Sequence, residues 1–153
     1  MKITIISDTH DNLTVAKKVI EWSNKEGITL ILHCGDISSR ETINEMINSF
    51  KGDIRFVHGN ADINLTGIPD TDEVKIGNKN IAFTHFPELA KGLAESGKYD
   101  LVFYGHTHKP WEERIGKCRM INPGEAAGIF NKRTFAVYDS DSDKLELKMI
   151  DLL

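Results

Sequence analysis

The sequence contains only two cysteines, Cys34 and Cys118, and they lie far apart in the chain. The pair matches neither the spacing of a metal finger nor that of a thiol redox motif. We therefore expect a reduced, cytoplasmic protein in which both thiols are packing residues.

Long hydrophobic runs are also missing. The longest apolar stretches, such as residues 28–32, are far shorter than the ~20 residues that cross a bilayer. The first eight residues place few apolar side chains before an acid and contain no small-residue cleavage site. We expect neither an export signal nor membrane association.

Basic residues do not cluster anywhere in the sequence. The 19 Lys and Arg residues are outnumbered by 23 Asp and Glu residues, and the formal net charge is −4. Without a basic or aromatic-basic stripe, bulk nucleic-acid binding is not expected. An anionic substrate must therefore be attracted locally. No sequence feature fixes the oligomeric state, and a homo-oligomer is compatible with the sequence.

The length and composition predict one folded domain over residues 1–153. Hydrophobic residues make up 40% of the chain and charged residues 27%, which is typical of globular proteins. No linker, repeat or low-complexity tract divides the chain.

Strand and helix patterns alternate in the first part of the chain. Short β-branched and apolar runs predict strands at residues 2–7, 30–33 and 54–58. Helical spacing of apolar residues predicts a helix over 13–26 and a second one whose buried face is Ile43, Met46, Ile47 and Phe50. Ser38 or Ser39 would cap the second helix.

The pattern then changes to one dominated by strands. Residues 73–76 and 80–84 predict a hairpin, and residues 89–94 predict a short helix. Further strands are expected at 101–104, 111–115, 119–121, 134–138 and 145–150. We predict an α/β sandwich of two packed sheets with flanking helices.

Polar side chains stand just past the ends of five predicted strands: Asp8, Asp36, Asn60, His85 and His106. Ligands of layered α/β folds gather at the carboxyl ends of strands, so these side chains are expected to meet. Glycine directly precedes Asp36, Asn60 and His106, which permits sharp turns or close backbone approach. One shared site is therefore expected.

These residues, with His10 and His108, offer imidazole nitrogens and hard oxygens but no thiolate. Such a mixture suits Mn, Fe, Zn or Ni. Two ions roughly 3.5 to 4 Å apart would activate a bridging hydroxide and stabilise both oxygens of a phosphoryl displacement. With two carboxylates, such a site keeps about two positive charges and attracts phosphate.

Five short motifs carry a family resemblance: Asp8-Thr9-His10, Gly35-Asp36, Gly59-Asn60, His85 and Gly105-His106-Thr107-His108. Their order resembles that of calcineurin-like metallophosphoesterases, in particular the small stand-alone phosphodiesterases of bacteria and archaea. The resemblance covers nearly the whole chain and implies a four-layer α/β/β/α sandwich of two mixed sheets. It also implies two divalent ions, with manganese expected first and Ni, Fe or Zn as alternatives.

The same resemblance divides the ligands between the two ions. Asp8, His10, Asp36 and His108 would hold one ion, and Asp36, Asn60, His85 and His106 the other, with Asp36 bridging. A small phosphate ester would be the substrate.

The chain departs from the family pattern after Gly59-Asn60. Many phosphomonoesterases of the superfamily have a histidine there that assists the leaving group, whereas this chain has Ala61. A general acid contributes typically 10²- to 10⁴-fold. We therefore hypothesise a preference for phosphodiesters or good leaving groups. His58 is the candidate substitute acid, and His33 stands similarly before Asp36; core packing is the commoner role for both.

Several other residues have both a functional and a structural interpretation. Asp62 could orient a ligand or simply close a turn. Residues 122–124, Asn-Pro-Gly, predict a tight turn, and the family resemblance implies that this loop packs near the site. Phe86 and Trp111 could line a substrate pocket or pack in the core.

Two other classes of protein compete with the enzyme hypothesis. A protein-interaction scaffold on the same fold, like the retromer subunit of this superfamily, would need little or no catalysis. A phospho-accepting signalling domain would share the early strand-helix units, but it would need an acidic pair and a lysine where this chain has Asn60 and histidines.

Overall fold

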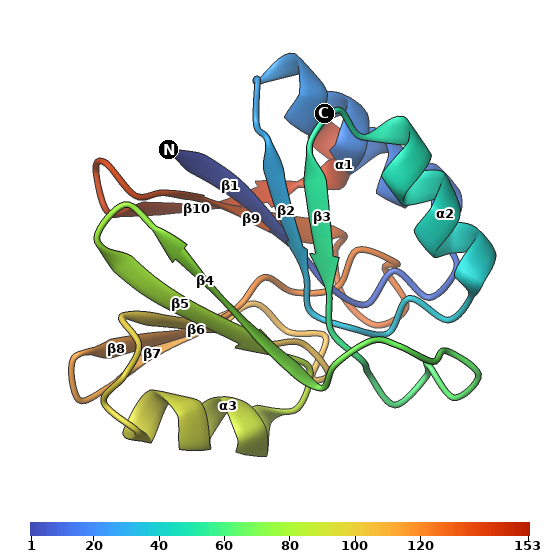
Figure 1. Cartoon of the computed structure of the whole chain (residues 1–153). Helices are drawn as coiled ribbons and strands as arrows, with labels where there is room; N and C mark the ends of the chain where they lie inside the picture. Colours follow the sequence, from blue (N-terminus) through green and yellow to red (C-terminus); the bar gives the residue numbers. More distant parts are fainter.

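Five strands form the first sheet of the computed structural model, which describes all residues 1–153 (Figure 1). The strand order is β10-β9-β1-β2-β3, with β1, β2 and β3 parallel and β9 and β10 antiparallel to their neighbours. The bounds are β1 (Lys2–Ile6), β2 (Leu30–His33), β3 (Asp53–Phe56), β9 (Thr134–Asp139) and β10 (Lys144–Met149).

The second sheet has the order β4-β5-β6-β8-β7. Its central strands β5, β6 and β8 are parallel, whereas the hairpin partners β4 and β7 are antiparallel to their neighbours. The bounds are β4 (Thr71–Ile76), β5 (Lys79–Thr84), β6 (Leu101–Phe103), β7 (Trp111–Ile115) and β8 (Cys118–Asn122). Both sheets are therefore mixed, as expected.

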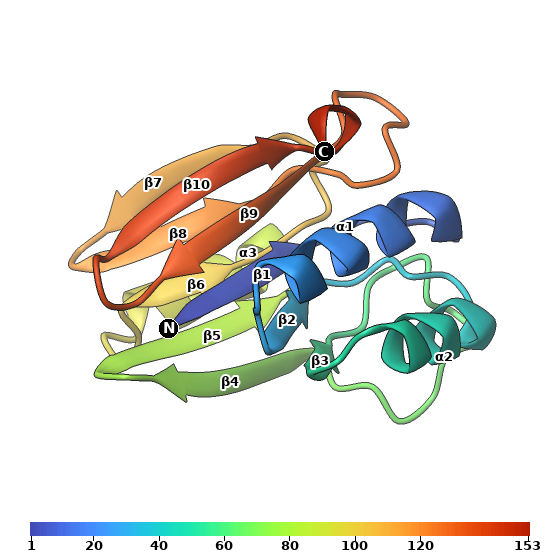
Figure 2. The ribbon, with the colours of Figure 1, turned by 90° about the horizontal axis from the view of Figure 1, so that it is seen from above.

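The two sheets pack face to face around one apolar core, and helices cover their outer faces (Figure 1). Helices α1 (Leu13–Lys25) and α2 (Arg40–Ser49) lie against the first sheet, side by side in Figure 2, and α3 (Pro87–Glu95) lies against the second. A short 3-10 helix, Ile150–Leu152, follows β10. The predicted four-layer α/β/β/α sandwich is confirmed.

Local signals explain most element boundaries. The Asn12 side chain accepts a hydrogen bond from the Val15 N–H at the start of α1, and the Ser39 hydroxyl caps α2 by accepting one from the Thr42 N–H. The prediction for the buried face of α2 was partly wrong. Ile47 is half exposed because Ile43 and Met46 already fill the side that faces the sheet.

The direction of the parallel strands decides where the polar loops lie. The carboxyl ends of β1, β2 and β3 share one edge of the first sheet, and those of β5 and β6 share one edge of the second. The loops that follow these strands carry the predicted site residues. No helix is long and apolar enough to cross a membrane.

Candidate metal centre

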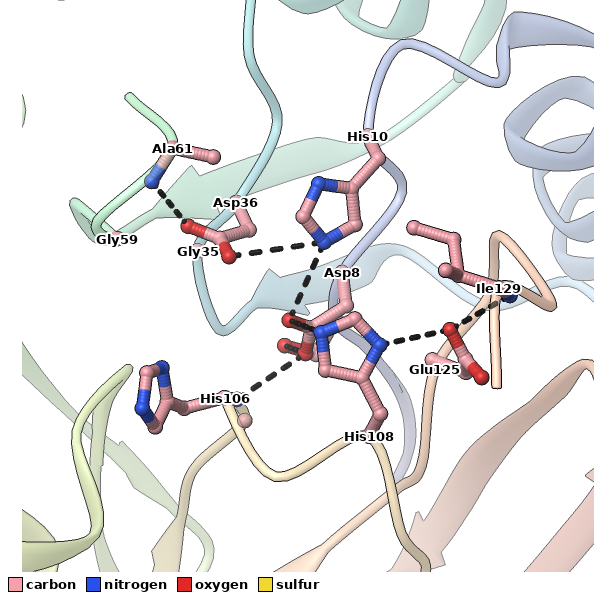
Figure 3. Close-up of polar contacts among 12 residues, drawn as sticks. Asp8, His10, Gly35, Asp36, Gly59, Ala61, His106, His108, Glu125 and Ile129 are labelled. Carbon is pink, nitrogen blue, oxygen red and sulfur yellow. Dashed lines mark hydrogen bonds and ion pairs between the residues drawn. The ribbon is translucent and has the colours of Figure 1, made fainter. Parts of the chain in front are cut away.

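Four donor side chains meet beyond β1 and β2, three of them buried and one, His10, partly exposed (Figure 3). Asp8 Oδ1 lies 3.7 Å from His10 Nε2 and 3.3 Å from His108 Nε2, and Asp36 Oδ2 lies 3.6 Å from His10 Nε2. One ligand atom from each of the four residues lies within 4.8 Å of the others. The structure thus brings together the four residues that the family resemblance assigns to one ion. We call them the buried group.

The other three residues form a second group around Asn60. The Asn60 Oδ1 atom lies 3.0 Å from His85 Nε2 and 2.9 Å from His106 Nδ1. His85 Nε2 is also 3.4 Å from Asp36 Oδ2, so this one oxygen faces both groups. His85 is buried, but Asn60 and His106 are exposed to solvent. We call these three residues the exposed group.

Most residues of the site have a left-handed backbone conformation. That conformation costs a non-glycine L-residue roughly 1–2 kcal/mol, and such strain clusters at functional sites. Five of the seven residues adopt it, with φ values of 54°, 43°, 58°, 71° and 61° for Asp8, His10, Asp36, His106 and His108.

Two glycines let the loops approach one another closely. A Cβ atom on Gly59 would lie 2.3 Å from Asp36 Oδ1, and one on Gly105 would lie 2.1 Å from Ser7 Oγ and 2.7 Å from Asp8 Oδ2. The glycines that precede Asn60 and His106 therefore provide the close backbone approach expected from the sequence.

Asp62 holds the turn after β2 against the loop after β3. Its carboxylate accepts hydrogen bonds from the backbone N–H groups of Asp36, Ile37, Ser38 and Gly59, at 2.7 to 2.9 Å. The carboxylate is completely buried. Asp62 therefore orients the backbone of Asp36, which favours the first of the two interpretations of this residue.

Two imidazoles are aimed by hydrogen bonds at their Nδ1 atoms. His85 Nδ1 donates to the Cys34 carbonyl at 2.7 Å. His108 Nδ1 donates to Glu125 Oε2 at 2.7 Å, as Figure 3 shows. In both rings the Nε2 atom is thereby turned toward Asp36 or Asp8. Such partners fix the tautomer and orientation of metal-binding histidines.

Glu125 was not predicted from the sequence. It is completely buried and also accepts hydrogen bonds from the backbone N–H groups of residues 129–131, which fold around its carboxylate. The available signal was its position directly after the Asn-Pro-Gly turn. Asn122 in that turn donates through Nδ2 to the Gly105 carbonyl and the Thr107 hydroxyl, so the turn supports the loop that carries His106 and His108.

We expect Glu125→Gln to lower the affinity for a divalent ion and the hydrolytic rate by about 10- to 100-fold. A glutamine would have to present its amide N–H₂ to His108 Nδ1 or to backbone N–H groups, which are also donors. Calorimetric titration with Mn²⁺ would measure the change. Glu45→Gln is the matched control, since Glu45 lies on the surface and pairs with Lys17. Equal affinities in the two variants would contradict the role of Glu125.

The neighbouring groups of the site counteract the effect of burial on the pKa values of Asp36 and His10. Burial by itself raises the pKa of Asp36, but the neighbouring His85 ring and the hydrogen bond from the Ala61 N–H outweigh it and leave the pKa below its usual value. The Asp8 carboxylate likewise raises the pKa of His10 against the effect of burial. The clustered carboxylates of Asp8 and Asp36 therefore favour positive charge between them.

The donor atoms of the buried group fit a divalent cation. Asp8 Oδ1 and His10 Nε2 are both buried, and neither has a hydrogen-bond partner. Leaving a buried polar atom unpaired costs roughly 1–3 kcal/mol, so such atoms require an explanation. A cation shared by carboxylate oxygens and imidazole nitrogens would satisfy both atoms.

The two remaining histidines lie outside both groups. His33 is buried, and its ring contacts the Thr9 hydroxyl and the Gly35 N–H. His58 lies with Nδ1 4.0 Å from Asp70 Oδ1, and no hydrogen bond or ion pair joins it to the seven residues. Phe86 lies beside His85, whereas Trp111 lies in a groove between β7 and β10.

His33 should make the metal-free protein less stable in acid. Burial lowers the pKa of His33 to about 4, whereas an unfolded histidine titrates near ~6.5. Only the unfolded chain binds the proton between these values, so the stabilisation is complete above the unfolded pKa and is lost as the pH falls toward 4. The stability difference between the wild type and His33→Gln, measured with urea, should shrink by about 2 kcal/mol from pH 7 to 4.5. A constant difference would show that folding leaves the pKa of His33 unchanged.

Comparison with known families adds an independent result. The sequence profile of the calcineurin-like phosphoesterase superfamily domain matches residues 1–143. The chain belongs to this superfamily. The family and its phosphodiesterase relatives support a metal-dependent phosphoesterase that acts on small substrates.

Individual members of the superfamily support the assignment. A phosphodiesterase of Methanocaldococcus jannaschii is 36% identical over 143 residues, covering 84% of this chain and 86% of its own. The solved structure of an archaeal phosphodiesterase has a TM-score of 0.87 and 31% identity, covering 97% of this chain and 99% of its own. Vps29 of Chaetomium thermophilum, 19% identical with a TM-score of 0.78, covers 97% of this chain and 93% of its own. This last likeness shows the fold alone.

Proposed function

We propose that the seven residues hold two divalent ions and that the enzyme hydrolyses phosphodiesters or phosphate esters with good leaving groups. The observation that carries the proposal is the position of Asp36 Oδ2, which lies 3.6 Å from His10 Nε2 and 3.4 Å from His85 Nε2. An oxygen between two donor groups is suited to bridge two ions. The buried group would hold one ion, and Asp36 with the exposed group the other.

The chain's own residues prepare the centre for two ions. The Ala61 N–H donates to Asp36 Oδ1 at 2.7 Å, which leaves Oδ2 to face both groups. When bound, the ions would supply a hydroxide nucleophile at neutral pH and stabilise charge on the attacking and leaving oxygens. Manganese is the ion expected from the donors, with Ni, Fe or Zn as alternatives.

Ala61 supports the preference for diesters. Only its backbone N–H takes part in the site, so this position supplies no acid to protonate a leaving alkoxide. An ester with an aryl leaving group, such as a bis-aryl diester, is less affected by that lack, because an aryl oxide leaves without a proton. Alkyl monoesters should therefore be poor substrates.

A substrate screen tests the proposal directly. The purified protein would be assayed with Mn²⁺, Ni²⁺, Mg²⁺ and Zn²⁺ against bis(4-nitrophenyl) phosphate and alkyl phosphomonoesters. We expect the aryl diester to have a kcat/KM on the order of 100-fold higher, within the usual range of general acid catalysis. Faster hydrolysis of alkyl monoesters would refute the preference for diesters.

His58 is our candidate for the missing acid, and leaving-group dependence tests it. If His58 protonates the leaving oxygen, His58→Asn should slow diesters with alkyl leaving groups by about 10²-fold or more and aryl ones much less. Equal losses of kcat/KM for the alkyl and the aryl diesters would instead indicate that His58 has a structural role near Asp70. Asp70→Asn is the matched control for that contact.

The scaffold hypothesis is the second candidate, and the fold similarity to Vps29 is its support. A scaffold need not bind two equivalents of a transition metal. Elemental analysis of the purified protein, combined with the diester assay, separates the two functions. Fewer than two equivalents of metal together with no hydrolysis would favour the scaffold.

A further inference from the structure

An exposed aromatic ring stands beside the buried group. Phe130 is 76% exposed, although phenylalanine is normally among the most buried side chains. Its ring meets the His108 ring edge-on, with 5.1 Å between the centroids. Phe130 thus adjoins a donor residue while most of its surface faces solvent.

The loop that carries Phe130 is held firmly in spite of this exposure. The Ile129 N–H donates to Glu125 Oε2 at 2.8 Å, as Figure 3 shows. The Phe130 N–H donates to Glu125 Oε1 at 2.6 Å. The Asn131 side chain also donates to the His108 carbonyl at 3.0 Å. One carboxylate therefore fixes both His108 and the loop. Because the backbone that carries Phe130 is already ordered, ligand binding does not have to order this loop.

The surroundings of the site offer a second aromatic contact. Phe86 lies on the other side, 5.1 Å from the His85 ring and 5.5 Å from the His106 ring. No lysine or arginine forms a hydrogen bond or ion pair with any of the seven residues. None of these contacts supplies a cation for a second phosphate, whereas a flat aromatic group of a substrate could pack against Phe130.

We propose that Phe130 is a specificity-determining residue that stacks an aromatic substituent of the substrate, an aryl group or a nucleobase on one ester oxygen. This inference rests on the proposed phosphodiesterase function and names the class of substrate. Stacking on an exposed aromatic side chain should strengthen binding on the order of fivefold to tenfold.

Two phosphonates, one with a phenyl group and one with a methyl group on phosphorus, test the inference by binding rather than by turnover. Phenylphosphonate and methylphosphonate would be titrated calorimetrically into the Mn²⁺-loaded wild type, Phe130→Ala and Phe130→Trp. We expect the wild type to bind phenylphosphonate at least about fivefold more tightly, Phe130→Ala to lose the preference and Phe130→Trp to keep it. Leu152→Ala is the matched control, because Leu152 is 78% exposed and lies in the 3-10 helix after β10.

Each outcome supports or overturns the role of Phe130. A phenyl preference that survives in Phe130→Ala, or that is absent from the wild type, overturns it. An unchanged preference together with a change of oligomeric state in Phe130→Ala would place the ring in a protein interface instead. If Phe130→Ala loses the phenyl preference but the wild type hydrolyses no diester, the proposed reaction is refuted and the aromatic subsite is retained.

Discussion

Asp36→Ala should reduce kcat/KM for bis(4-nitrophenyl) phosphate by about a thousandfold or more. Its Oδ2 atom faces the buried group through His10 and the exposed group through His85, so one substitution removes a ligand from both proposed ions. Metal ions contribute several kcal/mol of transition-state stabilisation, and ~4 kcal/mol corresponds to about a thousandfold. Kinetics and elemental analysis of the same sample would measure the loss of rate together with the loss of metal.

Asp11→Asn is the matched control for this substitution. Asp11 follows His10 directly and also has a positive φ, but its carboxylate accepts hydrogen bonds from the hydroxyls of Ser39 and Thr42. The variant should keep both ions and most of its activity. Circular dichroism would establish that Asp36→Ala is folded. Activity that survives in folded Asp36→Ala would rule out a bridging role.

Gly59→Ala should damage both stability and activity, although glycine has no chemistry of its own. The added Cβ would lie 2.3 Å from Asp36 Oδ1 and 2.5 Å from the Asp36 backbone nitrogen. Overpacking of this kind costs typically about 1–3 kcal/mol, and a displacement of ~1 Å at a reactive centre can cost about 100-fold in rate. Urea denaturation and diester kinetics would measure the two effects.

The control is a glycine with free space around it. Gly92 lies within α3, and a Cβ there would meet no heavy atom within 4 Å. Gly92→Ala should stabilise the protein by about 0.5–1 kcal/mol and leave the rate unchanged, because alanine is the better helix former. If Gly59→Ala behaved like Gly92→Ala, the close contact with Asp36 would be unimportant.

The sequence predicted the elements and the meeting of the donor residues for a simple physical reason. Buried parallel strands appear as short apolar runs, and their carboxyl ends share an edge, so a polar residue after each run falls into the same region. Asp8, Asp36 and His106 could be placed in this way. Glycine before two of these three residues added the signal of close backbone approach.

The residues that support the donors could not be predicted in the same way. Glu125 lies in a loop without periodic pattern, and its role depends on His108 and on the way residues 129–131 fold around it. For Asp62, the sequence is equally compatible with an ordinary turn acid, and only the four backbone N–H groups that donate to it reveal its role. Contacts between separate loops arise from tertiary packing, which one sequence does not reveal.

The left-handed backbone at five of the seven residues links folding to the supply of metal. The metal-free fold must hold these conformations against their cost, whereas the unfolded chain is free to relax them. An ion that binds only the folded site stabilises it by mass action, so each tenfold rise in free ion above the dissociation constant adds about 1.4 kcal/mol per site. The melting temperature should therefore rise with ion concentration, and a chelator would shorten the lifetime of the folded chain as well as stopping its chemistry.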